Sequence, residues 1–151
     1  GQLWALMGLT GAASGLLTGR LGSEGRERLI IAGAMLVAAG CLAVLSVSAS
    51  VVAVVAAVAA LGLGTGPMDI ALFSIRQRRT DPAWFGRAFA VSMHLNYAGV
   101  PVGSAISGPL IGSSMTVALA VAALCALIAA GLTLATIPAA APAEAASAGG
   151  S

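Results

Sequence analysis

The fold of this chain is decided by the stretch at residues 76–87, which reads Arg76-Gln77-Arg78-Arg79-Thr80-Asp81-Pro82-Ala83-Trp84-Phe85-Gly86-Arg87. It holds four of the seven basic residues of the chain, and the other three lie in one short segment at 20–28. Residues 29–68 and 88–143 contain no Asp, Glu, Lys or Arg. Two arginine-rich segments separated by long uncharged runs are typical of a membrane protein whose basic loops stay on the cytoplasmic side.

The composition excludes most soluble classes. Of the 151 residues, 59% are hydrophobic and 8% are charged, and the mean hydropathy is +1.02. Soluble domains carry roughly 25% charged residues, so a soluble fold would lack polar side chains for its surface. The net charge is only +2 and there is no lysine, so we do not expect nucleic-acid binding. Cys41 and Cys125 stand alone in apolar runs, and we predict small packed residues rather than a metal or cofactor site.

The apolar runs predict five membrane crossings. A spanning helix needs about 20 apolar residues. Residues 1–19 suffice for one, and the run at 29–68 suffices for two that are separated by a serine-rich turn at 46–50. The segment at 86–140 divides in the same way at 112–114. We therefore predict an all-α polytopic membrane protein with a tail at 139–151 that is too poor in bulky residues to pack and is disordered. The predicted spans are 1–19, 29–45, 51–75, 86–111 and 115–137.

Five crossings place all seven arginines on one side, because successive loops alternate between the two faces of a membrane. We expect that side, and the C-terminal tail, to be cytoplasmic, with the protein in the inner (plasma) membrane. One interpretation of the loop arginines is that they only set the orientation of the protein in the membrane. The other is gating, in which they hold the cytoplasmic helix ends together when the protein changes conformation. The residues concerned are Arg20, Arg26, Arg28, Arg78, Arg79 and Arg87.

The five predicted spans differ in character. Those at 29–45 and 115–137 are almost wholly aliphatic, as expected of helices that face lipid. The first span carries Gly11, Gly15 and Gly19 at four-residue spacing, which lets a neighbouring helix approach closely. Pro67 in the third span and Pro101 in the fourth lack an amide hydrogen, so we expect a kink or a break at each.

Two stretches resemble the major facilitator superfamily of transporters. Gly15-Leu16-Leu17-Thr18-Gly19-Arg20-Leu21-Gly22, followed by Gly25-Arg26-Glu27-Arg28, is similar to the second copy of that family's cytoplasmic signature, Gly-x-x-x-Asp-Arg-x-Gly-Arg-Arg. The loop at 77–82, with Gly86-Arg87-Ala88-Phe89 and the glycines downstream, resembles the corresponding region of bacterial efflux-type members. The resemblance implies that residues 1–138 form the eighth to twelfth helices of a C-terminal bundle, in which the tenth helix lines the central cavity.

Asp69 is the most informative single residue. It lies inside the third predicted span, seven residues before Arg76, or about 10 Å along a helix. A carboxylate at such depth is costly and is by default a functional candidate, here for binding a proton or a cationic substrate. The alternative is structural: if the helix breaks at Pro67, Asp69 lies in the first turn of the next segment, where the helix dipole favours an anion.

The fourth predicted span supplies the other candidates. His94 is expected at a depth similar to that of Asp69, where a contact between the two would suit a proton relay, although a lone histidine is more often bonded to a neighbour. Asn96 and Ser92 belong to a stripe of small residues that is either a cavity wall or a packing seam. Tyr97 lies on the His94 side, where it either bonds a substrate or fills a gap.

For function, the resemblance implies a fragment of a secondary active transporter that exports a small organic molecule or drug in exchange for protons, by alternating access. Its partners would be the lipid bilayer, the missing N-terminal half, the substrate and protons. The alternatives are an uptake symporter or facilitator of the same fold, and a non-transporting membrane scaffold or truncated product. We do not expect an enzyme, because the sequence contains no His-Glu-x-x-His motif, no phosphate loop and a single histidine.

Overall fold

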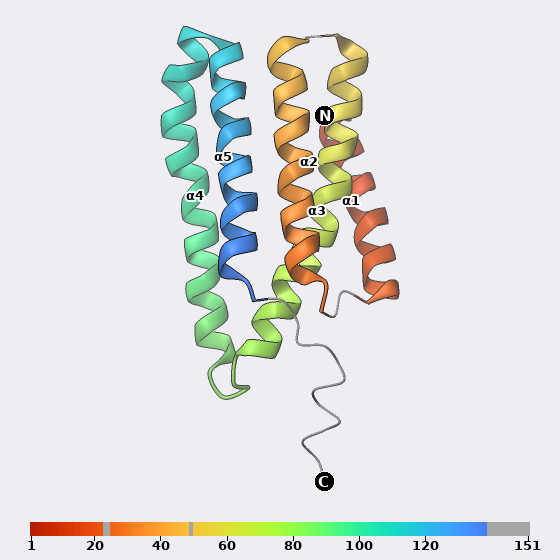
Figure 1. Cartoon of the computed structure of the whole chain (residues 1–151), viewed down its shortest axis with the longest axis vertical. Coiled ribbons are helices and arrows are strands. Elements are labelled where there is room, and N and C mark those ends of the chain that lie inside the picture. Colours follow the sequence, from red (N-terminus) through yellow and green to blue (C-terminus); the bar gives the residue numbers. More distant parts are fainter. Residues whose placement is uncertain (23–24, 49, 139–151) are drawn as a thin grey trace.

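The computed structural model describes residues 1–22, 25–48 and 50–138, and α-helices make up nearly all of them (Figure 1). The prediction of an all-α fold with five helices is confirmed for these residues. The tail predicted to be disordered, 139–151, lies outside the described residues. The helices are α1 (Gln2–Leu21), α2 (Glu27–Val47), α3 (Val51–Arg79), α4 (Phe85–Ser113) and α5 (Met115–Thr136).

The arginine stretch at 76–87 is mostly helical rather than a loop. Helix α3 runs on to Arg79, so that three arginines stand in its last turn, where cations interact favourably with the helix dipole. Helix α4 begins at Phe85. The connection between them is short, and the Oδ1 atom of Asp81 accepts a hydrogen bond of 2.8 Å from the amide of Ala83 within it. The two longest helices of the chain are therefore joined by a tight turn.

The two serine-rich turns separate α2 from α3 and α4 from α5, and a serine of each turn caps the helix that follows. Ser50 stands at the N-cap of α3, and its hydroxyl accepts a hydrogen bond of 3.1 Å from the amide of Ala53. Ser114 stands at the N-cap of α5 and accepts a hydrogen bond of 3.4 Å from the amide of Val117. Each hydroxyl satisfies one of the amides that a helix start leaves without a partner.

The prolines lie inside helices and do not end them. Pro67 lies inside α3, and Pro101 and Pro109 lie inside α4. The break that we considered at Pro67 is therefore absent, and α3 is continuous from Val51 to Arg79. Figure 1 shows α3 changing direction in its lower, green part, toward the base of α4. A missing hydrogen bond at a proline is an ordinary cause of such a bend.

The helices pack in an order that differs from their order in the chain. Helix α1 packs along α3, α3 along α2, α2 along α5, and α5 beside α4. Helix α4 meets α3 only sparsely, near the turn that joins them (Figure 1). Helix α3 is thus the centre of one group of helices, while α4 lies at the edge of the bundle.

The seam between α1 and α3 is built from glycines. A Cβ atom on Gly66 would stand 2.8 Å from the amide nitrogen of Gly15 and would overlap the carbonyl oxygen of Gly11. A Cβ atom on Gly62 would overlap the hydroxyl of Thr10. Only glycine lets the two backbones approach this closely, and such approach is a principal source of helix association in lipid. The close contact predicted for Gly11 and Gly15 is confirmed, and its partner is α3.

The interior of the bundle is made of small side chains. The buried apolar residues within the described ranges are seven alanines and Ile31, and no large side chain there is fully buried. Leu, Val and Trp side chains point outward instead, among them Trp4, which is 74% exposed. A soluble bundle would bury its large side chains, whereas lipid solvates them. Among the described helices, α2, α3 and α5 are long and apolar enough to cross a membrane.

Three phenylalanines form the link between α3 and α4. The ring of Phe89 lies 5.6 Å from that of Phe73 and 5.7 Å from that of Phe85, measured between centroids. The guanidinium of Arg76 lies 6.0 Å from the centroid of the Phe89 ring. Because α3 and α4 touch little elsewhere, this cluster holds the hairpin at its angle.

We expect the substitution Phe89→Ala to lower the free energy of unfolding in detergent by about 2 kcal/mol, because it removes two ring–ring contacts. The measurement is the midpoint of thermal unfolding followed by circular dichroism. The matched control is Tyr97→Ala, since Tyr97 is on the same helix, 67% exposed, and without a ring contact in the described part of the chain. Equal midpoints for the two variants would contradict a role for the cluster.

Candidate functional site

Asp69 lies in the interior of the continuous helix α3 and is exposed. The alternative in which it caps a second helical segment is therefore wrong, because no helix begins near it. It forms no hydrogen bond or ion pair within the described residues. An unpaired carboxylate in an apolar helix is expensive in a membrane and needs a polar surrounding.

The side of α3 that carries Asp69 follows from its neighbours. Phe73 comes one helical turn later, so the two side chains share a face. Phe73 contacts Phe85 and Phe89 of α4. Thr65 comes one turn earlier and lies at the contact with α1, so Asp69 lies between the face of α3 that meets α1 and the face that meets α4.

The face of α4 that continues from Phe89 carries Ser92 and Asn96. These residues come three and seven positions after Phe89, which contacts α3, so they continue its stripe along the helix. Asn96 is exposed and Ser92 is half-buried. Helical spacing thus places Ser92 and Asn96 on the side of α4 that turns toward α3 at Phe89.

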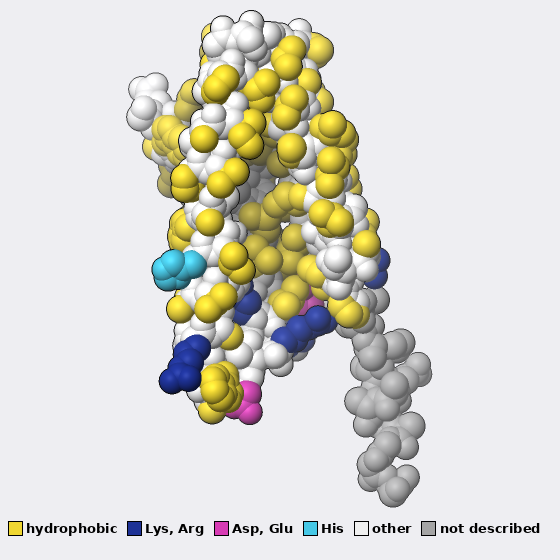
Figure 2. Space-filling model, turned by 90° about the vertical axis from the view of Figure 1, so that its left-hand side faces the viewer, with side chains coloured by type: hydrophobic (Ala, Val, Ile, Leu, Met, Phe, Trp, Pro, Cys, Tyr) yellow, Lys and Arg dark blue, Asp and Glu magenta, His cyan; other side chains and the backbone are white. Residues whose placement is uncertain are grey.

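His94 points elsewhere. At 100° per residue it lies about 140° around α4 from Phe89. Its Nδ1 atom lies 2.8 Å from the carbonyl oxygen of Ala90, one turn back in the same helix, and the side chain is exposed (Figure 2). No hydrogen bond or ion pair joins His94 to Asp69 within the described residues. Tyr97 is also exposed.

Helix α4 is open along its length. None of its residues is buried. A Cβ atom on Gly99, Gly103 or Gly108 would meet nothing within 4 Å. The small residues of α4 therefore form no packing seam with the other described helices, in contrast to those of α1. Figure 2 shows a hollow in this side of the molecule, between two columns of side chains, with apolar side chains deep inside it.

The arginines gather at one end of the bundle, at the bottom of Figure 2. Helix α1 ends there with Arg20, α3 ends there with Arg78 and Arg79, and α2 and α4 begin there beside Arg26 and Arg87. The guanidinium of Arg87 lies 5.2 Å from the centroid of the Trp84 ring. Both arginine-rich segments thus lie at the same end of the bundle.

Glu27 and Arg78 form an ion pair that the sequence analysis did not anticipate. The Nη2 atom of Arg78 lies 3.2 Å from the Oε1 atom of Glu27. This ion pair joins the start of α2 to the end of α3. The side chain of Glu27 is only 10% exposed and that of Arg78 is 45% exposed. In the sequence, the acid Glu27 stands just before an uncharged apolar run. Its partner lies 51 positions away along the chain, so sequence spacing does not predict the pair.

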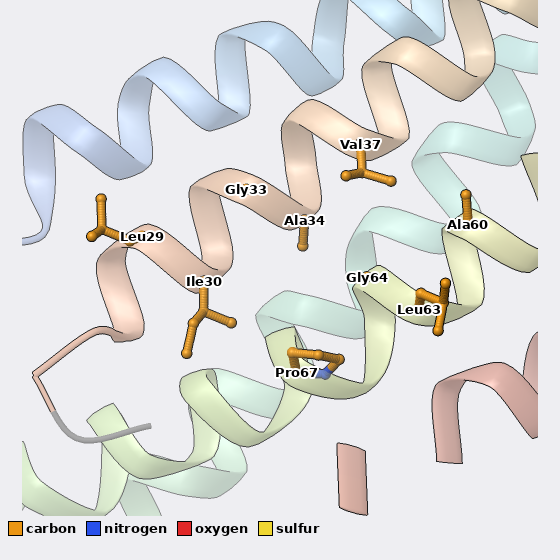
Figure 3. A pocket seen from close by; sticks show the side chains of 9 residues that line it. All are labelled: Leu29, Ile30, Gly33, Ala34, Val37, Ala60, Leu63, Gly64 and Pro67. Carbon is orange, nitrogen blue, oxygen red and sulfur yellow. The ribbon is translucent and has the colours of Figure 1, made fainter. Parts of the chain in front are cut away.

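An apolar cavity of about 430 Å³ lies between α2 and α3 (Figure 3). Ala34 faces Gly64 across it, where an added Cβ atom would stand 3.6 Å from the Cα of Ala34. No charged side chain lines this cavity, and none of the predicted site residues reaches it, so it suits an aliphatic chain rather than a polar substrate. Its lining is Leu29, Ile30, Gly33, Ala34, Val37, Ala60, Leu63, Gly64 and Pro67.

Within the described ranges, no cluster of three or more His, Cys, Asp or Glu side chains is placed to hold a metal ion. The polar groups of the predicted site on α3 and on the Phe89 side of α4 are one carboxylate, one amide and one hydroxyl. Such groups bind a proton or a cation and form hydrogen bonds.

Comparison with known proteins agrees with this architecture. The chain is 36% identical over 142 residues to an uncharacterized MFS-type transporter, y4rN, of Sinorhizobium fredii. The match covers 94% of the chain and 35% of that protein, so the chain spans about a third of the length of this relative. No protein-family model matches the chain. No solved structure matches it.

Proposed function

This chain belongs to the major facilitator superfamily, and we propose that, in the complete protein, it forms one wall of a pathway through which a small organic molecule crosses the membrane. The missing N-terminal half of the transporter would supply the opposite wall. The two walls would then rock about a site near the middle of the membrane, by alternating access.

One observation supports this proposal above the others: α4 presents polar side chains that the other described helices do not cover. Asn96, His94 and Tyr97 are exposed on it, and its glycines have open space around them. A helix that only anchored the chain in lipid would be aliphatic, as α2 and α5 are. Polar groups at such depth are expected where a water-filled passage or another polar surface meets them.

Asp69 is the proposed coupling residue. A carboxylate that takes up a proton from one side of the membrane and releases it to the other can link proton entry to substrate export. Asn96 and Ser92, on the side of α4 that carries Phe89, would bond the substrate or an ordered water. His94 and Tyr97, on the other sides of α4, are proposed as contacts of the same pathway with the part of the protein outside this chain.

We further propose that the arginine end is cytoplasmic and that the protein lies in the inner membrane. The positive-inside bias supports this orientation, since all seven basic residues belong to the two arginine-rich segments. A cysteine placed at Thr80 would then react with a membrane-impermeant thiol reagent only from the cytoplasmic side.

The substitution Asp69→Asn is expected to abolish proton coupling. With one proton exchanged per substrate, one pH unit of gradient supports about a tenfold gradient of substrate, since one unit is 1.36 kcal/mol. The measurement uses everted vesicles that contain the complete protein and a panel of fluorescent organic amines and acids. In the variant, the panel member that the wild type concentrates should equilibrate across the membrane without accumulating.

The matched control is Asp81→Asn, which makes the same change in the turn between α3 and α4. The amide oxygen of asparagine can still accept the hydrogen bond from Ala83 that the Asp81 carboxylate accepts, so wild-type accumulation is expected. Full pH-driven accumulation by Asp69→Asn would eliminate Asp69 as the coupling site. If the wild type moved no member of the panel, export of organic ions would be rejected.

A further inference from the structure

A second, polar cavity lies at the arginine end of the bundle. It has a volume of about 140 Å³ and lies between the start of α2, the end of α3 and the residues that follow α5. It is separate from the apolar cavity between α2 and α3, and it contains none of the residues proposed for the transport pathway. The side chains that matter here are Glu27, Arg28, Ile75, Arg78, Arg79 and Ile137.

The cavity has an excess of positive charge. Three guanidinium groups line it against one carboxylate. That carboxylate, Glu27, is paired with Arg78 at 3.2 Å. Arg28 and Arg79 therefore contribute two positive charges that no acid within the described ranges neutralises.

Arg28 also carries an unmet hydrogen-bond donor. Its Nε atom is buried and has no hydrogen-bond partner among the described residues. A buried N–H group without an acceptor is costly, and the cost is larger for a charged group. The Oε1 atom of Glu27 is likewise buried without a hydrogen bond among the described residues, so it is the net charge of the cavity, two positive charges in excess, that favours an anion.

The surroundings narrow the class of anion. Guanidinium groups match the geometry of phosphate oxygens, to which they donate paired hydrogen bonds. The cavity lies at the arginine end of α2, α3 and α5, the three helices that are long and apolar enough to cross a membrane, and Ile75 and Ile137 give it an apolar wall. Basic pockets between transmembrane helices at this level bind the headgroups of anionic lipids. We propose that this cavity binds a phosphate group, and that the phosphate belongs to an anionic phospholipid headgroup.

The test is a binding titration with the complete protein in detergent. The probe is phosphatidylglycerol with a fluorescent acyl chain, and the comparison lipid is zwitterionic phosphatidylcholine with the same chain. The wild type should bind phosphatidylglycerol saturably and more tightly than phosphatidylcholine. An arginine in direct contact with an anionic headgroup contributes about fivefold to the affinity, on the scale of about 1 kcal/mol per basic residue at an anionic surface, so Arg28→Gln with Arg79→Gln should weaken phosphatidylglycerol binding about 25-fold and leave phosphatidylcholine unchanged.

The matched control is Arg20→Gln with Arg87→Gln, which removes the same charge from the same end of the bundle but outside the cavity. It should change the affinity by no more than about twofold, because exposed charges at a distance are screened. An equal loss in the two double variants would overturn the proposal, since binding would then follow net charge alone.

Two further measurements complete the test, one with a single variant and one with a soluble competitor. Arg79→Gln alone removes an exposed side chain, so it should preserve the fold and still weaken binding about fivefold. Wild-type affinity in this variant would overturn the site. Glycerol 3-phosphate distinguishes the two sources of phosphate: failure to compete supports a lipid ligand, whereas full competition at millimolar concentration would overturn the lipid assignment in favour of a soluble phosphate.

Discussion

Replacing both Gly62 and Gly66 with alanine is expected to lose about 4 kcal/mol of stability and to leave little folded protein. At Gly66 the new methyl group would overlap the carbonyl oxygen of Gly11, and at Gly62 it would overlap the hydroxyl of Thr10. The Thr10 side chain can rotate, but the new methyl group at Gly62 would also lie 2.5 Å from the backbone carbonyl oxygen of Met7, so at both sites the backbone of α1 must move away. Overpacking of this kind costs up to about 3 kcal/mol at each site, and the better helix propensity of alanine offsets about 1 kcal/mol of it.

The control for this experiment is an identical double change on α4, Gly99→Ala with Gly103→Ala. An added methyl group meets nothing within 4 Å at either position. Only the propensity gain of up to about 1 kcal/mol per site remains, so this control should be slightly more stable than the wild type. Thermal unfolding of both double variants in detergent, followed by circular dichroism and size exclusion, measures the contrast. A shift of the same sign and size in both would refute the glycine seam as the basis of the α1–α3 contact.

Removing the buried acid at the arginine end is the second large effect. The substitution Glu27→Gln is expected to lower the free energy of unfolding by about 2 kcal/mol. Breaking a fully buried pair costs 3–5 kcal/mol, but the Arg78 side chain is 45% exposed and water recovers part of its charge. Because the pair joins the start of α2 to the end of α3, the variant should loosen these ends before the rest of the bundle.

A double-mutant cycle isolates the pair from the other contacts of each residue. Glu27→Gln, Arg78→Gln and the double variant are compared by chemical unfolding in detergent. A double variant that is destabilised by clearly less than the sum of the two single variants indicates coupling. Strict additivity would mean that the 3.2 Å contact contributes nothing to stability. Arg20→Gln serves as the control for loss of an exposed arginine at the same end and should be neutral.

Much of the architecture could be predicted from the chain alone, because it depends on local composition. Hydrocarbon solvates aliphatic side chains and rejects guanidinium groups, so the uncharged runs predicted helices and the arginines predicted a common end. Serines at the turns marked where α2 gives way to α3, and α4 to α5. The glycine spacing of α1 predicted the close approach of a neighbouring helix. These features are all properties of neighbours in sequence.

The candidate site was predicted less completely, because its geometry depends on how helices are rotated against one another. Asp69 and His94 were expected at the same depth, and a contact between them was considered. The phenylalanine cluster turns the Phe89 side of α4 toward α3 instead, while the Nδ1 atom of His94 lies 2.8 Å from the carbonyl oxygen of Ala90 in its own helix. Sequence spacing gives the depth of a side chain, but not the direction in which a neighbouring helix turns its face.

The sequence by itself determined that this protein is a helical membrane bundle with one basic end, since the cost of charge in lipid acts on each segment separately. Only the tertiary structure decided that α1 pairs with α3 through glycines, that Glu27 meets Arg78, and that α4 stands open. Those features join residues far apart in the chain. Each of them depends on how closely two particular helices can pack. That fit depends on both helices together, so neither sequence segment specifies it alone.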